Sequence, residues 1–101
     1  MDVSNLWARV GTGDLEARNE LVERFLPLVR YVAGQMRGHM PSHVDADDLI
    51  SYGQLGLIDA IERFDPERGR QYGSVNGAFP SFAVTRIRGA IIDELRAQDW
   101  A

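Results

Sequence analysis

Residues 45–69 read DADDLISYGQLGLIDAIERFDPERG, and they predict a helix that has a clear signal at each end. Asp45 is a good N-cap, and the acidic residues after it suit the positive end of a helix dipole. Asp65 and Pro66 end the pattern, because the residue before a proline is driven away from helical geometry. Between these ends the apolar residues recur at steps of three and four, the spacing of one buried helix face: Leu49, Ile50, Leu57, Ile58, Ile61 and Phe64. We expect this to be the central helix.

Two glycines interrupt this helix at a spacing of three. Gly53 and Gly56 each cost roughly 1 kcal/mol relative to alanine in a helix interior. Small residues at this spacing let another backbone approach closely, and that backbone belongs either to this chain or to a partner. The sequence leaves both readings open.

The chain before residue 45 predicts a short helix and then a longer one. Gly11 and Gly13 end the first, and Asp14 caps the second. Apolar residues at the helical period continue to residue 36, but Pro27 lies among them. Because an interior proline removes a backbone hydrogen bond, we expect a kink or a break, with pieces at about 15–25 and 27–38.

The chain after residue 65 predicts a long loop and a last helix. Residues 66–78 contain three glycines, one of them in an asparagine-glycine pair typical of turns. Pro80 suits the first turn of a helix, which we expect to run to about Gln98. The fold class is therefore all-α, a compact three- to four-helix bundle with a long loop before the last helix.

The composition is that of one small domain without bound groups. The chain has 101 residues, no cysteine and two histidines, too few ligands for a closed metal site. It has no apolar run long enough to span a membrane and no signal peptide, so we expect a cytoplasmic protein with no cofactor and no membrane partner. No nucleophile, base or phosphate-binding motif points to an enzyme.

The charge is acidic overall but basic in one segment. The chain has a net charge of −4, whereas residues 63–91 contain five arginines against two acids. A local basic segment of this kind is compatible with nucleic-acid binding, and the small number of cations predicts weak binding in isolation.

Several longer strings carry a resemblance to a known family. They are DLI at 48–50, GLI at 56–58, FAVTRIRGA at 82–90, DELR at 93–96 and DW at 99–100. Together they resemble conserved region 2 of bacterial RNA polymerase sigma factors, and the last three are similar to the flagellar and sporulation branch, the WhiG/FliA-like group. The resemblance implies that residues 1–101 are a single region 2 domain without regions 3 and 4.

The resemblance implies a polymerase-binding surface on the central helix. In sigma factors this helix docks on the clamp coiled coil of the largest polymerase subunit. The matching positions here are Asp48, Ser51, Tyr52, Gln54 and Ile58. Tyr52 has an alternative reading as a partly buried aromatic residue of the bundle.

The resemblance also implies a surface for the melted minus-ten element of promoter DNA. Its positions here are Arg68, Phe79, Ser81, Phe82, Arg86 and Arg88. By this match Phe82 faces a flipped adenine, with Ser81 beside it. Phe79 is alternatively a hydrophobic staple over the last helix, and Arg88 alternatively pairs with an acid of a neighbouring helix. Arg86 shares the face of Phe82, which makes it the stronger arginine candidate.

One segment departs from the family. About seven residues, Gln71 to Gly77, are additional in the loop before the last helix, and the sequence does not tell whether they are native or engineered. The expected function is promoter recognition by an alternative sigma factor, through core RNA polymerase and the single-stranded minus-ten element. The alternative is an interaction module that serves as a docking surface for polymerase or an anti-sigma factor.

Overall fold

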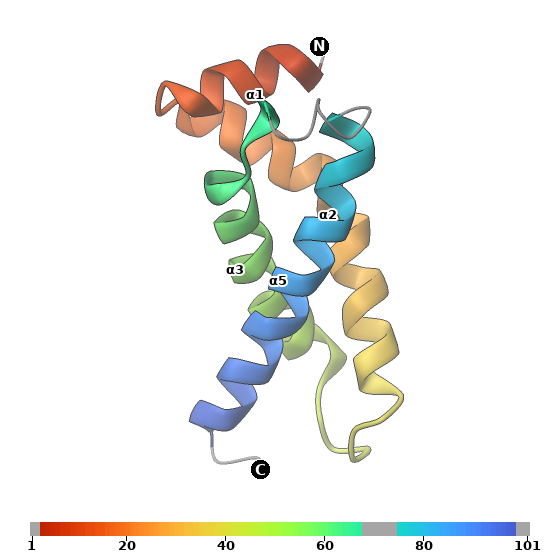
Figure 1. Ribbon diagram of the computed structural model, residues 1–101. Helices are drawn as coiled ribbons and strands as arrows, with labels where there is room; N and C mark the ends of the chain where they lie inside the picture. The colour runs from red at the N-terminus through yellow and green to blue at the C-terminus, as the bar shows by residue number, and fades with distance from the viewer. Residues whose placement is uncertain (1–2, 68–74, 99–101) are drawn as a thin grey trace.

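A computed structural model describes residues 3–67 and 75–98, and these residues form an all-α bundle (Figure 1). The helices are α1 (Val3–Gly11), α2 (Leu15–Arg37), α3 (Ala46–Arg63) and α5 (Val75–Ala97). Helix α3 packs mainly against α2 and α5, and α1 packs on α2. No strand occurs in the described part of the chain, so the predicted all-α class is confirmed.

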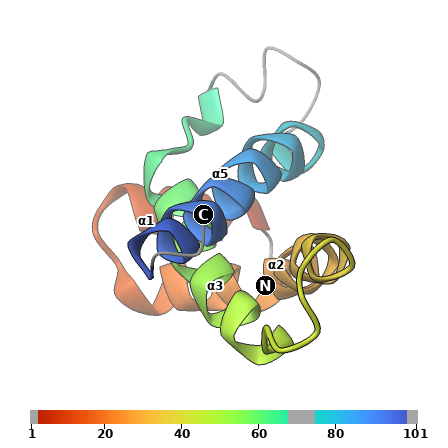
Figure 2. The ribbon, with the colours of Figure 1, turned by 90° about the horizontal axis from the view of Figure 1, so that it is seen from below.

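Helix α2 is continuous through Pro27, so, of the expected kink or break, the break into two pieces is wrong, whereas the kink agrees with the bend of the helix (Figure 1). The helix changes direction along its length, which both views show: its first half crosses beneath α1, and its second half descends on the right of Figure 1 and is seen nearly end-on in Figure 2. A kink is the usual result of a proline inside a helix, because the lost hydrogen bond and the ring displace the preceding turn. The bend lets one helix pack on both ends of the bundle.

Helix α5 begins at Val75, five residues before the predicted start at Pro80. Residues 66–67 are also helical, so the loop expected over residues 66–78 is wrong at both of its ends. Residues 71–74 of the additional segment lie outside the described residues. The burial of Phe79 gives a physical reason for the earlier start, because its packing stabilises the helical turn that precedes Pro80.

The predicted helix caps are confirmed at two positions. The side chain of Asp14 accepts hydrogen bonds from the backbone N–H groups of Glu16 and Ala17, and Asp45 accepts one from Asp47. Gly13 has φ +87°, a left-handed conformation that glycine adopts without strain, and it turns the chain between α1 and α2. Phe64 is extended at the end of α3, directly before Asp65 and Pro66.

The core contains an aromatic cluster centred on Phe79, whose side chain has no exposed surface. The ring of Phe79 lies 4.9 Å from Trp7, 4.7 Å from Phe25 and 5.2 Å from Phe64, measured between centroids. These rings come from α1, α2, α5 and the end of α3, so the cluster joins all parts of the bundle. Edge and tilted contacts of this kind add to the hydrophobic stabilisation of buried rings.

The glycines of α3 serve packing within this chain. A Cβ atom at Gly56 would lie 2.6 Å from the carbonyl oxygen of Arg86 and 2.8 Å from the Cα of Ile87. At Gly53 it would lie 2.8 Å from a methyl group of Val29. The backbones of α3 and α5 therefore touch at Gly56, where only glycine fits without displacement.

Candidate nucleic-acid interface

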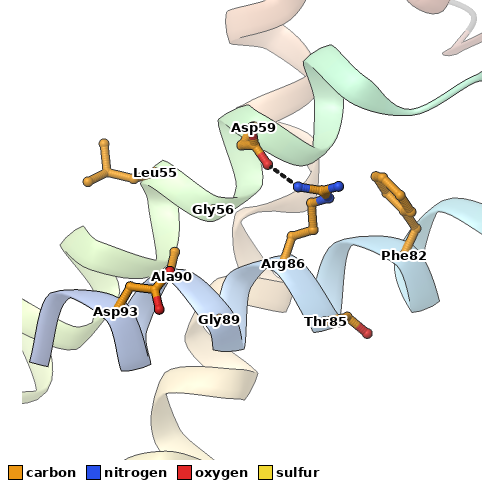
Figure 3. Close-up of a pocket in the computed structure, with 9 residues that line it drawn as sticks. All are labelled: Leu55, Gly56, Asp59, Phe82, Thr85, Arg86, Gly89, Ala90 and Asp93. Atoms are coloured by element: carbon orange, nitrogen blue, oxygen red, sulfur yellow. Dashed lines mark hydrogen bonds and ion pairs between the residues drawn. The ribbon is translucent and has the colours of Figure 1, made fainter. Parts of the chain in front are cut away.

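A groove of about 620 Å³ lies along the line where α3 and α5 cross (Figure 3). The side chains that line it are Leu55, Gly56, Asp59, Phe82, Thr85, Arg86, Gly89, Ala90 and Asp93. Gly56 forms its floor by bringing the two backbones together. Gly89 leaves its other wall open, since nothing lies within 4 Å of the position where a Cβ would be. The groove thus follows from two helices that approach closely at small residues.

An arginine and an aromatic ring meet at one end of the groove. The guanidinium carbon of Arg86 lies 5.1 Å from the centroid of the Phe82 ring, within the range of a cation–π contact. Phe82 is half-buried and also packs on Phe64, with 5.5 Å between the ring centroids. The one-turn spacing of Phe82 and Arg86 on α5 puts them on the same side of the helix, as the sequence predicts.

An acidic side chain of α3 holds this arginine. Asp59 accepts a 2.7 Å hydrogen bond from Arg86 through Oδ2 and a 2.6 Å hydrogen bond from Arg63 through Oδ1. The guanidinium of Arg63, and then that of Arg86, hold the pKa of Asp59 below its usual value. The carboxylate is therefore charged at neutral pH and links the two helices across the groove.

The structure brings only some of the predicted DNA-binding residues together. Phe82 and Arg86 line the groove, and Ser81 is exposed next to Phe82 in the chain. Arg88 is exposed elsewhere, where it lines a separate hollow with Gln35, Met36 and His39. Among the described residues Arg88 has no ion-pair partner, so its alternative pairing with an acid is not observed. Arg68 lies outside the described residues.

Phe79 takes the packing role that was its alternative reading. Its ring is fully buried in the aromatic cluster, so it offers no surface to a base in this conformation. The reason is the phase of α5, because Phe79 precedes Ala83 and Ile87 at steps of four on the core face. We therefore leave Phe79 out of the contact surface.

The residues predicted to bind polymerase lie on the outer half of α3. Asp48 and Ser51 are exposed, and Gln54 and Ile58 are partly exposed. Tyr52 is also partly exposed, and its hydroxyl accepts a 2.6 Å hydrogen bond from the side chain of Gln98. Tyr52 thus has a contact within the bundle and a surface that remains accessible.

Sequence reasoning missed two side chains on the same half of α3. Leu55 is 60% exposed, although it is a large apolar residue. Its signal was present, since about 100° per residue puts it opposite the buried stripe of the helix. Asp59 was missed as the partner of Arg86. Its spacing of four from Arg63 predicts their ion pair within α3, but nothing local in the sequence predicts the ion pair with Arg86 of α5.

Residues 3–67 and 75–98 show neither a metal-binding cluster nor a membrane-spanning helix. These residues contain no group of three or more histidine, cysteine, aspartate or glutamate side chains placed to hold a metal ion. None of their helices is both long and apolar enough to cross a membrane.

Comparison with known proteins identifies the family. The family model described as Sigma-70 region 2 matches residues 21–101. The chain is 46% identical over 87 residues to "RNA polymerase sigma-D factor" of Bacillus subtilis strain 168, covering 86% of this chain and 32% of the relative. It is 44% identical over 84 residues to "RNA polymerase sigma factor FliA" of Yersinia enterocolitica, covering 83% of this chain and 34% of the relative. It is 39% identical over 98 residues to the protein of the same name from Escherichia coli K12, covering 97% of this chain and 37% of the relative.

The chain spans about a third of the length of these curated relatives. Both the extent of the family match and the level of identity exceed what a shared fold alone requires. The chain therefore belongs to the sigma-70 region 2 family, in its FliA-like branch.

Proposed function

We propose that this chain is the promoter-recognition domain of an alternative sigma factor, which binds core RNA polymerase and captures the melted non-template strand of the minus-ten element. The relatives are named as RNA polymerase sigma factors, which supports the general assignment. The observation that carries the strand-capture part is the contact between Arg86 and Phe82 in an open groove. It offers an aromatic surface and a cation in one place.

The groove suits a single strand better than a duplex. A base removed from the stack costs a few kcal/mol, and stacking on an aromatic side chain returns about 1–3 kcal/mol. Phe82 supplies the ring, and exposed Ser81 supplies a hydroxyl beside it. Arg86 supplies a cation for phosphate, which gives affinity without base preference.

The test is fluorescence-anisotropy binding of a short single-stranded minus-ten oligonucleotide at low salt, with the chain alone and with a bacterial core polymerase. Phe82→Ala should weaken binding about fivefold or more, as expected for the loss of one stacked base. Tyr31→Ala is the matched control, because Tyr31 is an aromatic residue that is 59% exposed and lies on α2, outside the groove. Equal binding by the wild type and the Phe82→Ala variant, with unfolding midpoints that match, would refute strand capture at this groove.

We further propose that the outer half of α3 docks on the clamp coiled coil of the polymerase. Leu55 is the apolar anchor, and Asp48 and Ser51 are the exposed polar residues around it. An exposed leucine among polar groups is a usual centre for a protein interface. Leu55→Asp should abolish binding to core polymerase, whereas Leu15→Asp should not, although Leu15 is equally exposed at 61%.

The second candidate function is docking without DNA recognition, with an anti-sigma factor as another protein that covers the α3 surface. The net charge of −4 favours it, because an acidic chain gains little from phosphate contacts. The two candidates separate in the same binding experiment. Docking alone predicts that Leu55→Asp abolishes partner binding. It also predicts that substitutions of Phe82 or Arg86 leave the affinity for the oligonucleotide unchanged.

A further inference from the structure

The ion pair between α3 and α5 has a consequence for how a strand enters the groove. Resting on the proposed function, we infer that Asp59 is a positioning residue that latches Arg86 over the Phe82 ring, and that a phosphate of the incoming strand releases the latch by taking Arg86 from Asp59. In the free protein the Arg86 guanidinium then covers the Phe82 ring at one end of the groove, and strand binding uncovers the ring.

The geometry of three side chains carries the latch (Figure 3). The Arg86 guanidinium lies between the Asp59 carboxylate, 2.7 Å away, and the Phe82 ring, 5.1 Å from its centroid. A base that stacks on Phe82 needs the surface over which the guanidinium now lies. The same arginine cannot remain on the ring and contact a phosphate outside the groove.

Asp59 forms an ion pair with a second helix in addition to the pair within its own helix. Its Oδ1 already accepts from Arg63, four residues along α3, and this contact alone satisfies the spacing rule for helical pairs. Its Oδ2 is directed instead across the groove to α5. Because both oxygens are occupied by arginines, the carboxylate is held in one orientation, and it holds Arg86 in turn.

The latch is weak enough for a strand to open. The side chains of Asp59 and Arg86 are each 39% exposed, so solvent screens their attraction. An ion pair at such exposure shifts an equilibrium by no more than about fivefold. A phosphate accepts hydrogen bonds from a guanidinium at least as well as a carboxylate does, so the exchange of one anion for the other costs little.

The experiment compares two aspartates of one groove. Asp59→Asn and Asp93→Asn remove the same charge from the groove lining, but only Asp59 contacts Arg86. Oligonucleotide affinity should rise about threefold in Asp59→Asn and by a smaller factor in Asp93→Asn. In an Arg86→Gln background the advantage of Asp59→Asn over Asp93→Asn should disappear, because Arg86 is no longer present to be released to the phosphate, and the contact of Asp59 with Arg63 is not part of the latch.

A second measurement needs no DNA and separates a latch from a general charge effect. The Nη–Hη signals of Arg86 in the free protein, followed by nuclear magnetic resonance, report how firmly the guanidinium is held, because Nη1 is the atom that donates to Asp59. Asp59→Asn should speed its hydrogen exchange with water severalfold, and Asp93→Asn should leave it unchanged. A purely structural role for Asp59 would lower the unfolding midpoint without this local change.

Three results would overturn the latch. If the wild type binds the oligonucleotide and Asp59→Asn binds no tighter than Asp93→Asn, the latch is overturned while strand capture stands. An Arg86 signal that is insensitive to Asp59→Asn also overturns it. If neither the wild type nor any variant binds, alone or with polymerase, the proposed strand capture fails and the latch fails with it.

Discussion

Substituting Gly56 by alanine tests the close approach of the α3 and α5 backbones. The new Cβ would lie 2.6 Å from the Arg86 carbonyl oxygen, 2.8 Å from the Ile87 Cα and 2.9 Å from the Ala90 Cβ. Ordinary van der Waals contact begins at 3.4 Å, and two of these atoms belong to the backbone, so α3 and α5 must move apart. Overpacking of this kind costs about 3 kcal/mol or somewhat less, and alanine regains about 1 kcal/mol of helix propensity. We expect a net loss of about 2 kcal/mol in the free energy of unfolding.

Other glycines of the same bundle provide matched controls. At Gly53 the nearest atom is a methyl group of Val29, 2.8 Å away, which moves more easily than backbone, so Gly53→Ala should cost less. At Gly89 nothing lies within 4 Å, so Gly89→Ala should gain up to about 1 kcal/mol from helix propensity alone. The expected order of stability is Gly89→Ala, wild type, Gly53→Ala and Gly56→Ala.

Thermal and urea unfolding followed by circular dichroism measure this order. A loss of 2 kcal/mol lowers Tm by about 8–16 °C in a domain of this size. If Gly56→Ala is as stable as Gly89→Ala, the helices do not touch where the structure puts them. The groove floor and the distance from Asp59 to Arg86 would then be wrong as well.

Three further predictions concern the core, α5 and acid stability. Phe79→Ala should lower the free energy of unfolding by about 3–5 kcal/mol, because Phe79 is fully buried. If the variant keeps its stability but loses oligonucleotide binding, Phe79 contacts DNA after all. Pro80→Ala should raise the free energy of unfolding by about 1–3 kcal/mol, because α5 begins at Val75 and Pro80 is interior; no gain would support a start at Pro80. The pKa of Asp14 is lowered by Arg9 and that of Asp59 by Arg63 and then Arg86, so both carboxylates stabilise the fold above their unfolded pKa of about 3.9. This stability is lost as the pH falls through the lowered folded values, and Tm measured against pH should fall less steeply below about pH 4 in Asp14→Asn and Asp59→Asn than in the wild type.

The sequence predicts α3 closely because all its signals are local. The N-cap at Asp45, the apolar spacing and the stop at Asp65 and Pro66 lie within one stretch of chain, and each acts on its near neighbours. The structure places the helix at Ala46–Arg63, within a residue or two of those signals. The sequence also predicts a close backbone approach at the two glycines, but only the packed bundle shows that α5 is the backbone that approaches Gly56.

The ends of the other helices depend on packing, which local signals do not contain. Pro80 reads as a helix start, yet the buried ring of Phe79 stabilises a turn that begins earlier. Pro27 predicts a kink or a break, and the packing of the turns on both sides of it keeps α2 continuous and bent (Figure 1). In both places the tertiary contacts outweigh a backbone preference worth about 3 kcal/mol.

Asp59 is the residue of the groove that a single sequence does not predict. Arg86 was predicted from its own face of the last helix, but its partner is 27 residues away in the chain. Asp59 faces it because α3 and α5 meet at Gly56, three residues before Asp59 on the same side of α3. The glycine therefore allows the helix crossing, and the crossing brings Asp59 to Arg86.

The same crossing puts the two proposed surfaces on one turn of helix. Leu55 and Asp59 are four residues apart, about 6 Å along α3, and both line the groove. A protein that docks on Leu55 therefore reaches the edge of the groove in which Arg86 is held. If polymerase docks there as proposed, the captured strand runs beside the polymerase clamp, and a partner that covers Leu55 more broadly also blocks the strand. Under the proposed function, a partner that contacts Leu55 alone leaves the groove free for the strand. A partner that extends one turn further, to Asp59, inhibits promoter capture.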